Sequence, residues 1–293
     1  MPCLRKWLRS LLAGFTLVCC GALPTCADEA RPNRIEIAYL APKNPAHQPI
    51  YDEITRVSLL DPVRELLSTF RLPRPLLIKT EGCDGEINAW FENDTITLCY
   101  EYLEWIGEIA SKRRAPIPAS TTGARIGPFL ELVIHEAAHA LFAYLETPVF
   151  GREEDAADRL AAFILLAMPP EKAKDLLAGI ANVYLDEAGF RSIRHLKRRR
   201  LGITRAAVQA DEHSLPLQRM YNLLCLAYGS NDKEYDMLVT SGLLPKERAE
   251  GCAEEYRQTR HAFDRLLAPH LDREAAERVK ARFQLQFPQQ DLR

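Results

Sequence analysis

The sequence predicts an α+β fold in which a single domain, residues 28–293, is built from two lobes. Segments with the alternating, β-rich pattern of strands occur only before residue 100, and two of them form a hairpin that would supply the edge of a small mixed sheet. Later in the chain, apolar residues recur at helical spacing. We therefore expect an α+β lobe over residues 28–123 and a helical lobe over residues 124–293.

Four segments of the first lobe predict strands because they are short, rich in β-branched and aromatic residues, and bounded by turn residues. The third and fourth segments flank Glu92-Asn-Asp94, which is typical of a hairpin turn. The four segments are residues 34–40, 76–81, 86–91 and 95–99.

Helices are predicted where apolar residues recur every three or four positions. Pro62 divides residues 51–70 into two helices, because proline interrupts a helix interior. Gly127-Pro128 fits the start of a long apolar helix over residues 128–146, with proline at its first position. The other predicted helices cover residues 100–111, 152–168, 171–188, 215–228, 232–240, 246–267 and 273–287.

The first 27 residues have the pattern of a secretory signal peptide. Three basic residues precede an apolar run, residues 11–23, that is too short for a comfortable membrane span, and small residues at Thr25 and Ala27 favour cleavage after Ala27. An uncleaved anchor is the alternative. The formal net charge is −2, and loss of the three basic residues would make it −5, so the charge does not favour nucleic acid binding. After cleavage we expect no stable membrane span. We expect an exported protein, periplasmic or secreted.

Four cysteines follow the predicted cleavage site. An even number in an exported chain indicates two disulfides. Three pairings are possible, and proximity in the sequence favours Cys83 with Cys99 and Cys225 with Cys252. Free buried thiols are the alternative.

The strongest chemical signal is His135-Glu-Ala-Ala-His139 within the long apolar helix. Histidines four residues apart lie on one helix face, so both rings can bind a single metal ion, and Glu136 lies beside them where it can act on a water molecule. This is the HExxH arrangement of zinc hydrolases. Two core histidines paired with carboxylates would be the purely structural interpretation.

A catalytic zinc site needs a third protein ligand, and Glu154 is the best candidate. Glu154 and Asp158 are four residues apart and share a helix face, so Asp158 can accept a hydrogen bond from a zinc-bound histidine, expected to be His135. Glu153 and Asp155 point elsewhere on the helix and are interpreted as an acidic first turn.

These residues resemble the gluzincin metallopeptidases, the thermolysin-like class in which a glutamate on a following helix is the third metal ligand. The chain resembles more closely a bacterial family of exported metallopeptidases, over most of its mature length. The resemblance implies a zincin-like fold and one zinc ion per chain. Its motifs are Asn88-Ala-Trp-Phe91, Thr95-Ile-Thr-Leu-Cys-Tyr100, Gly151-Arg-Glu-Glu-Asp-Ala-Ala-Asp158, Asp211-Glu-His-Ser214 and Asn222-Leu-Leu-Cys225.

Gluzincins bind extended substrates along an edge strand, and Asn88-Ala89-Trp90 resembles that element. The resemblance implies that the backbone of this strand and the Asn88 side chain bind the substrate. An ordinary buried hairpin with Trp90 in the core is the alternative.

Thermolysin-like enzymes also place a histidine or tyrosine near the oxyanion. His213, oriented by Asp211, is the expected donor, and the alternative is Tyr221.

Two further features receive no catalytic role. His47, His195, His261 and His270 have no comparable setting and are expected at the surface. The basic run of residues 191–200 is interpreted as a solvated helix face, with binding of an anionic lipid or polymer as the alternative.

The sequence therefore predicts a zinc-dependent metallopeptidase with a peptide or protein substrate. His135, His139 and Glu154 would hold the metal, and Glu136 would be the general base. The alternative is an exported zinc-binding or interaction protein without catalysis. Glu136 argues against it, because a purely structural zinc site usually has four Cys or His ligands.

Overall fold

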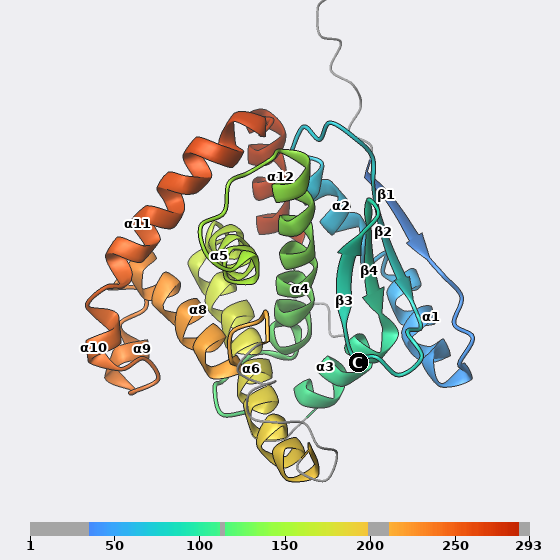
Figure 1. The fold of residues 1–293 in the computed structure, drawn as a ribbon, viewed down its shortest axis with the longest axis horizontal. Coiled ribbons are helices and arrows are strands. Elements are labelled where there is room, and N and C mark those ends of the chain that lie inside the picture. Colours follow the sequence, from blue (N-terminus) through green and yellow to red (C-terminus); the bar gives the residue numbers. More distant parts are fainter. Residues whose placement is uncertain (1–34, 112–114, 199–210, 287–293) are drawn as a thin grey trace, which may run out of the picture. The chain divides into compact units, whose positions relative to one another are not determined.

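The computed structural model describes residues 35–111, 115–198 and 211–286, which fall within one unit, Asn33–Arg293. Its sheet has four strands in the order β1-β2-β4-β3. The first three in that order are parallel: β1 (Ile35–Tyr39), β2 (Leu76–Glu81) and β4 (Thr95–Cys99). The fourth, β3 (Ala89–Glu92), pairs with β4 in an antiparallel hairpin and forms one edge. The fold is thus α+β with the small mixed sheet and hairpin edge that the sequence predicts (Figure 1).

Some predicted features lie outside the described residues. They include the signal peptide of residues 1–27 with its cleavage site, and the side chains of the basic run, residues 191–200, including His195. The leader and the surface position of this run stay predictions.

Three helices and a short 3-10 turn accompany the sheet in the first lobe. The turn, η1 (Pro45–His47), leads into α1 (Gln48–Arg56), and α2 (Asp61–Leu67) follows after a break. The prediction of two helices here is confirmed. The third helix, α3 (Tyr100–Ala110), directly continues β4.

His47 is not at the surface, as the sequence analysis expected, but 4% exposed. The Asn44 side chain caps η1 by accepting a hydrogen bond from the Ala46 N–H, and this turn brings the imidazole against the Tyr100 ring, 5.9 Å between centroids. Local sequence gave no sign of this because the Tyr100 ring comes from a distant segment.

The central helix is α4 (Thr121–Tyr144), which starts seven residues before the position predicted at Pro128. Ser120 caps it by accepting the Gly123 N–H at 2.9 Å, and Asp175 accepts from both the backbone N–H and the hydroxyl of Ser120. Pro128 therefore lies inside the helix. The capped start at Ser120, held by Asp175 of the neighbouring helix, sets the beginning of α4, so the expectation of proline at the first position was wrong.

Helix α4 lies between the sheet and the helices of the second lobe (Figure 1). Two glycines bring it almost into backbone contact with α6 (Pro170–Arg198): a Cβ on Gly127 would lie 2.3 Å from the Leu176 carbonyl oxygen, and one on Gly179 would lie 2.1 Å from the Gly123 carbonyl oxygen. Among the described helices, α4 is long and apolar enough to cross a membrane by length and composition, and most of it is buried inside the protein.

The second lobe is helical, as predicted. One predicted helix, residues 246–267, is instead divided, with a turn at Glu250 and Gly251. The remaining elements are α5 (Glu153–Leu166), α8 (Pro216–Ser230), α9 (Met237–Thr240), α10 (Lys246–Ala249), α11 (Cys252–Ala262), a π-helical turn (Phe263–Leu267), η3 (Ala268–His270) and α12 (Arg273–Gln286).

Both predicted disulfides are present. Cys83 bonds to Cys99, with Cα atoms 5.5 Å apart, and joins the loop before β3 to the end of β4. Cys225 bonds to Cys252, with Cα atoms 5.0 Å apart, and joins α8 to α11. Each disulfide therefore adds a covalent link between two segments of the chain.

Candidate metal centre

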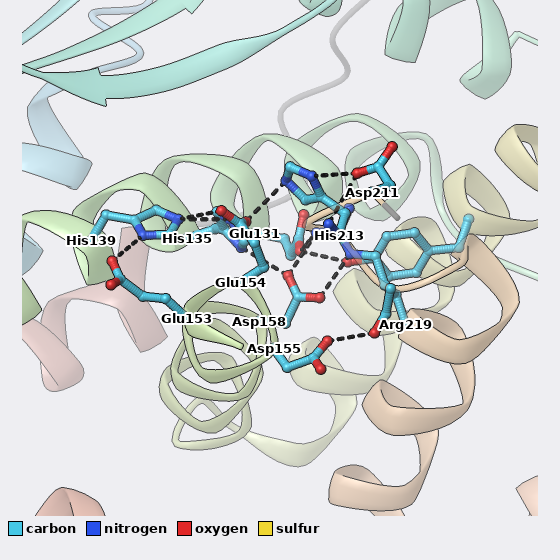
Figure 2. A network of polar contacts seen from close by, with 12 residues as sticks. Glu131, His135, His139, Glu153, Glu154, Asp155, Asp158, Asp211, His213 and Arg219 are labelled. Atoms are coloured by element: carbon cyan, nitrogen blue, oxygen red, sulfur yellow. Dashed lines mark hydrogen bonds and ion pairs between the residues drawn. The ribbon is translucent and has the colours of Figure 1, made fainter. Parts of the chain in front are cut away.

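Three potential ligands converge between α4 and α5. His135 and His139 lie one turn apart on α4, with their Nε2 atoms 3.2 Å from each other. Glu154, in the first turn of α5, places Oε2 3.0 Å from His135 Nε2 and Oε1 3.5 Å from His139 Nε2 (Figure 2). The structure therefore brings together the three residues that the sequence analysis selected.

The donor set fits a zinc ion. Two ligands held about 2.0–2.1 Å from a tetrahedral zinc are about 3.3 Å apart, and the three separations here bracket that value. Two imidazole nitrogens and one carboxylate are also the ligands of many catalytic zinc sites, which keep one position open. The residues present thus match the chemistry and the spacing that such a metal requires.

The charges around the two rings favour a cation. Burial of the imidazole opposes its protonation, but hydrogen bonds to Asp158 and Glu154 raise the pKa of His135 to about 10. Burial likewise opposes protonation of His139, whose pKa is nevertheless raised by Glu154 and Glu153. Burial would raise the pKa of Glu154, yet its contacts with His135, His139 and His213 hold that pKa far below the usual range. A metal ion can replace the ring protons in this setting.

Asp158 contacts His135, as predicted. Its Oδ1 lies 2.8 Å from His135 Nδ1, so the opposite nitrogen, Nε2, faces the other ligands. Asp158 is itself held by Arg219 of α8, whose Nε donates to Oδ2 at 2.7 Å and whose Nη2 donates to Oδ1 at 2.6 Å. This two-pronged contact fixes both the carboxylate and the ring behind the metal centre.

Arg219 belongs to a buried network that the sequence analysis missed. Its guanidinium lies over the Tyr184 ring, 4.8 Å from the centroid, and its Nη2 is 3.4 Å from Glu131. Tyr184 donates its hydroxyl to Glu131 at 2.6 Å. A single arginine in an amphipathic helix gives no sequence signal for such a role, because its acidic partners come from α4 and α5.

Glu153 and Asp155 do not point away from the site as expected. Glu153 places Oε1 2.7 Å from His139 Nδ1 and so orients the second ring, as Asp158 orients the first (Figure 2). Asp155 accepts the Ser214 hydroxyl at 2.6 Å and thereby holds the segment that carries His213. The expectation was wrong because the first turn of α5 lies between α4 and this segment, so side chains on different faces each meet a partner.

Glu136 faces a cleft beside the three potential ligands. It is 7% exposed and is one of the residues that line a cleft of about 870 Å³, together with His135, His139 and Glu154. Burial raises the pKa of Glu136, although the nearby rings of His135 and His139 favour its ionised form. The geometry therefore leaves its carboxylate beside the ligands and open to a water molecule in the cleft.

His213 reaches the same site. Its Nε2 lies 2.9 Å from Glu154 Oε2, its Nδ1 lies 3.4 Å from Asp211, and its ring stacks on His135 with centroids 6.3 Å apart. The contact with Glu154 raises the pKa of His213. Tyr221, the alternative, packs against the hydrophobic core and is not among the described residues that line the cleft. The structure thus brings His213, and not Tyr221, to the ligands.

The free edge of β3 faces the same cleft. Asn88, Ala89, Trp90 and Phe91 all contribute to its lining. The Cys99 N–H donates to the Asn88 carbonyl at 3.2 Å, and hydrogen-bonded positions alternate in an antiparallel pair. The backbone groups of Ala89 and Phe91 are therefore directed toward the open side, where an extended chain could pair with them.

Comparison with known proteins adds one finding. No curated protein and no solved structure matches the chain. Residues 39–267, which include the cleft, the ligands and both disulfides, match the model of a protein family, and the description of that family is "Putative metallopeptidase". Membership implies a bound metal ion and a peptide or protein substrate. The chain belongs to this metallopeptidase family.

Proposed function

We propose that the protein is a zinc-dependent peptidase of the gluzincin type, with a zincin-like fold. The observation that carries this proposal is the convergence of His135, His139 and Glu154 beside Glu136 in a cleft bordered by a free strand edge. A purely structural zinc site would not need a buried carboxylate next to its ligands, nor an open cleft.

The chain's own residues account for the steps of peptide hydrolysis. A zinc ion bound by the three ligands supplies a Lewis acid that acidifies a water and polarises a carbonyl. Glu136 accepts the proton of the attacking water and transfers it to the leaving amine nitrogen as the C–N bond breaks. His213 donates a hydrogen bond to the carbonyl oxygen as negative charge develops there. Asp158 and Glu153 keep the rings of His135 and His139 in place.

The substrate would bind as an additional strand along β3. The outward backbone groups of Ala89 and Phe91 pair with an extended peptide, and Asn88 donates from its side-chain amide to the peptide backbone. This mode holds any sequence by its main chain and leaves selectivity to the side-chain positions of the cleft. The support for it is the position of β3 at the sheet edge and in the cleft lining.

We also propose that the protein acts outside the cytoplasm. The leader pattern of residues 1–27 and the two disulfides support this, because disulfides persist in oxidising compartments. Sequencing of the exported protein from its N-terminus would find Asp28 first, whereas a retained Met1 would contradict cleavage.

The test of function is cleavage of a peptide library by the purified, zinc-loaded protein. We expect a chelator to abolish cleavage and added zinc to restore it. Glu136→Gln keeps the side-chain volume but cannot act as a base, so it should retain zinc and lower kcat by about 10²–10⁴-fold. Glu146→Gln, the same change outside the cleft lining, is the matched control. Equal cleavage by Glu136→Gln and the parent would rule out the catalytic assignment.

A further inference from the structure

We propose that Glu101 is a positioning residue for the substrate-binding edge, because its buried carboxylate holds the loop of residues 82–88 in the shape that directs Asn88 and β3 to the cleft. The proposal rests on the proposed function, since the aim of β3 affects activity only if substrates bind along it.

Glu101 is a buried anion held by backbone amides. It lies in the first turn of α3 and is 8% exposed. The Cys83 N–H lies 3.0 Å from both carboxylate oxygens, and the Gly85 N–H donates to Oε1 at 2.9 Å. Burial would raise the pKa of Glu101, but these N–H groups, with a smaller effect from His47, bring it below its ordinary value. A buried carboxylate is costly without such donors, so the loop and the carboxylate depend on each other.

The loop turns sharply at Asp84 and Gly85. Asp84 has a φ of 53° and Gly85 a φ of 95°, and the Glu86 N–H donates to the Cys83 carbonyl at 3.0 Å to close the turn. The left-handed conformation is uncommon outside glycine, and aspartate is one of the few other residues that adopt it. The carboxylate of Glu101 accepts hydrogen bonds from the N–H groups of Cys83 and Gly85, on both sides of Asp84. These bonds favour this turn over the other conformations that the loop could adopt.

Two further contacts anchor the same loop to the end of β4. The disulfide to Cys99 holds Cys83, and the Cys99 N–H binds the carbonyl of Asn88. The disulfide restrains one point, around which the loop could still turn. Glu101 adds contacts to two loop amides, and these fix the direction in which the loop leaves the disulfide. Glu86, Ile87 and Asn88 therefore line the cleft just before β3 begins.

The metal centre is built from other elements. Its ligands lie on α4 and α5, and none of the hydrogen bonds given above for Glu101 involves them. Loss of the Glu101 carboxylate should therefore weaken substrate binding while zinc and the catalytic groups stay in place. This separation distinguishes a positioning role from a general contribution to stability.

The test uses Glu101→Gln, which keeps the volume but turns one acceptor into an amide donor facing the loop N–H groups. We expect an unchanged zinc content, a KM about tenfold higher and a kcat within about twofold of the parent. Hydrogen exchange of the backbone amides over residues 86–92 should be faster, with α4 unchanged. Glu108→Gln, an exposed position on the same helix, is the matched control and should alter none of these quantities.

If Glu101→Gln showed the same hydrogen exchange as the parent over residues 86–92, or faster exchange with an unchanged KM, the proposal would be wrong. A variant that lost zinc, or whose kcat fell while its KM rose, would also contradict it, because the effect would then extend beyond β3 and its loop. A parent protein that cleaves no peptide would contradict the proposed function instead, and the exchange of residues 86–92 would still decide whether Glu101 holds the edge.

Discussion

The two histidines of the candidate metal centre each contact a carboxylate through Nδ1, but the two contacts differ in their surroundings. We call the His135 side the inner side and the His139 side the outer side. On the inner side, Asp158 contacts His135 Nδ1 at 2.8 Å, and Arg219 holds the carboxylate from behind. On the outer side, Glu153 contacts His139 Nδ1 at 2.7 Å. The Asp158 side chain is 15% exposed and the Glu153 side chain 53%, and the two rings they contact are 4% and 16% exposed. Contacts of nearly equal length are therefore found in different environments.

Environment decides what such a contact contributes. A buried charged contact is little screened by water or salt, while an exposed one loses most of its strength to solvent and to the freedom of its side chain. The inner pair is also restrained by a second residue, Arg219. We infer that the Asp158 contact restrains the metal ligands more strongly than the Glu153 contact does.

Glu154 contacts both histidines, so its removal should have the largest effect and affect both sides alike. Glu154→Ala should lower zinc affinity by more than the about 100-fold expected from loss of an outer-shell carboxylate. Metal analysis after dialysis against a weak chelator measures this. Asp155→Ala, the neighbouring change whose carboxylate binds Ser214, is the control and should remain loaded. A loaded Glu154→Ala beside an empty Asp155→Ala would refute the ligand assignment.

Asp158→Ala should have the second largest effect, because it frees the His135 ring and, among the described residues, leaves Arg219 with Glu131 as its acidic partner. We expect zinc affinity to fall by about 10–100-fold, measured by competition with a chromophoric chelator. The effect should change little between low and high salt, since the contact is buried. If the loss of zinc affinity in Asp158→Ala depended strongly on salt, the proposed difference between the Asp158 and Glu153 contacts would be wrong.

Glu153→Ala should have the smallest effect. We expect a loss in zinc affinity of less than about tenfold, because its carboxylate is exposed and screened. The loss should shrink further as salt is raised, in the same chelator competition. A loss equal to that of Asp158→Ala would show that burial does not govern these contacts, and the comparison would fail.

The parts of the site that could be predicted are those encoded by short spacings. His135 and His139 are four residues apart on one helix, and Glu154 and Asp158 repeat that spacing on the next, so helical geometry alone places each pair on one face. Cys83 with Cys99 and Cys225 with Cys252 were found by the same kind of proximity. The alternation of apolar residues likewise indicated the strands and their hairpin.

The parts that could not be predicted depend on residues far apart in the chain. Arg219 meets Asp158 across 61 positions, Asp155 meets Ser214 across 59, and Asp175 caps α4 through Ser120 across 55. The last contact explains why α4 begins before Pro128. Glu101 is another case, because an acidic residue in a helix pattern gives no indication that it binds loop amides.

The sequence by itself determined which residues make up the candidate site and the disulfides: a pair of histidines, a glutamate beside them, a carboxylate pair on the next helix and four cysteines that pair locally. Tertiary structure alone decided how those residues are supported and aimed. Helix periodicity acts over a few residues, so it can be read from the chain. The identity of a buried charge partner depends on which helices pack together, and that packing follows from the whole hydrophobic core, including the near backbone contact of α4 and α6 at Gly127.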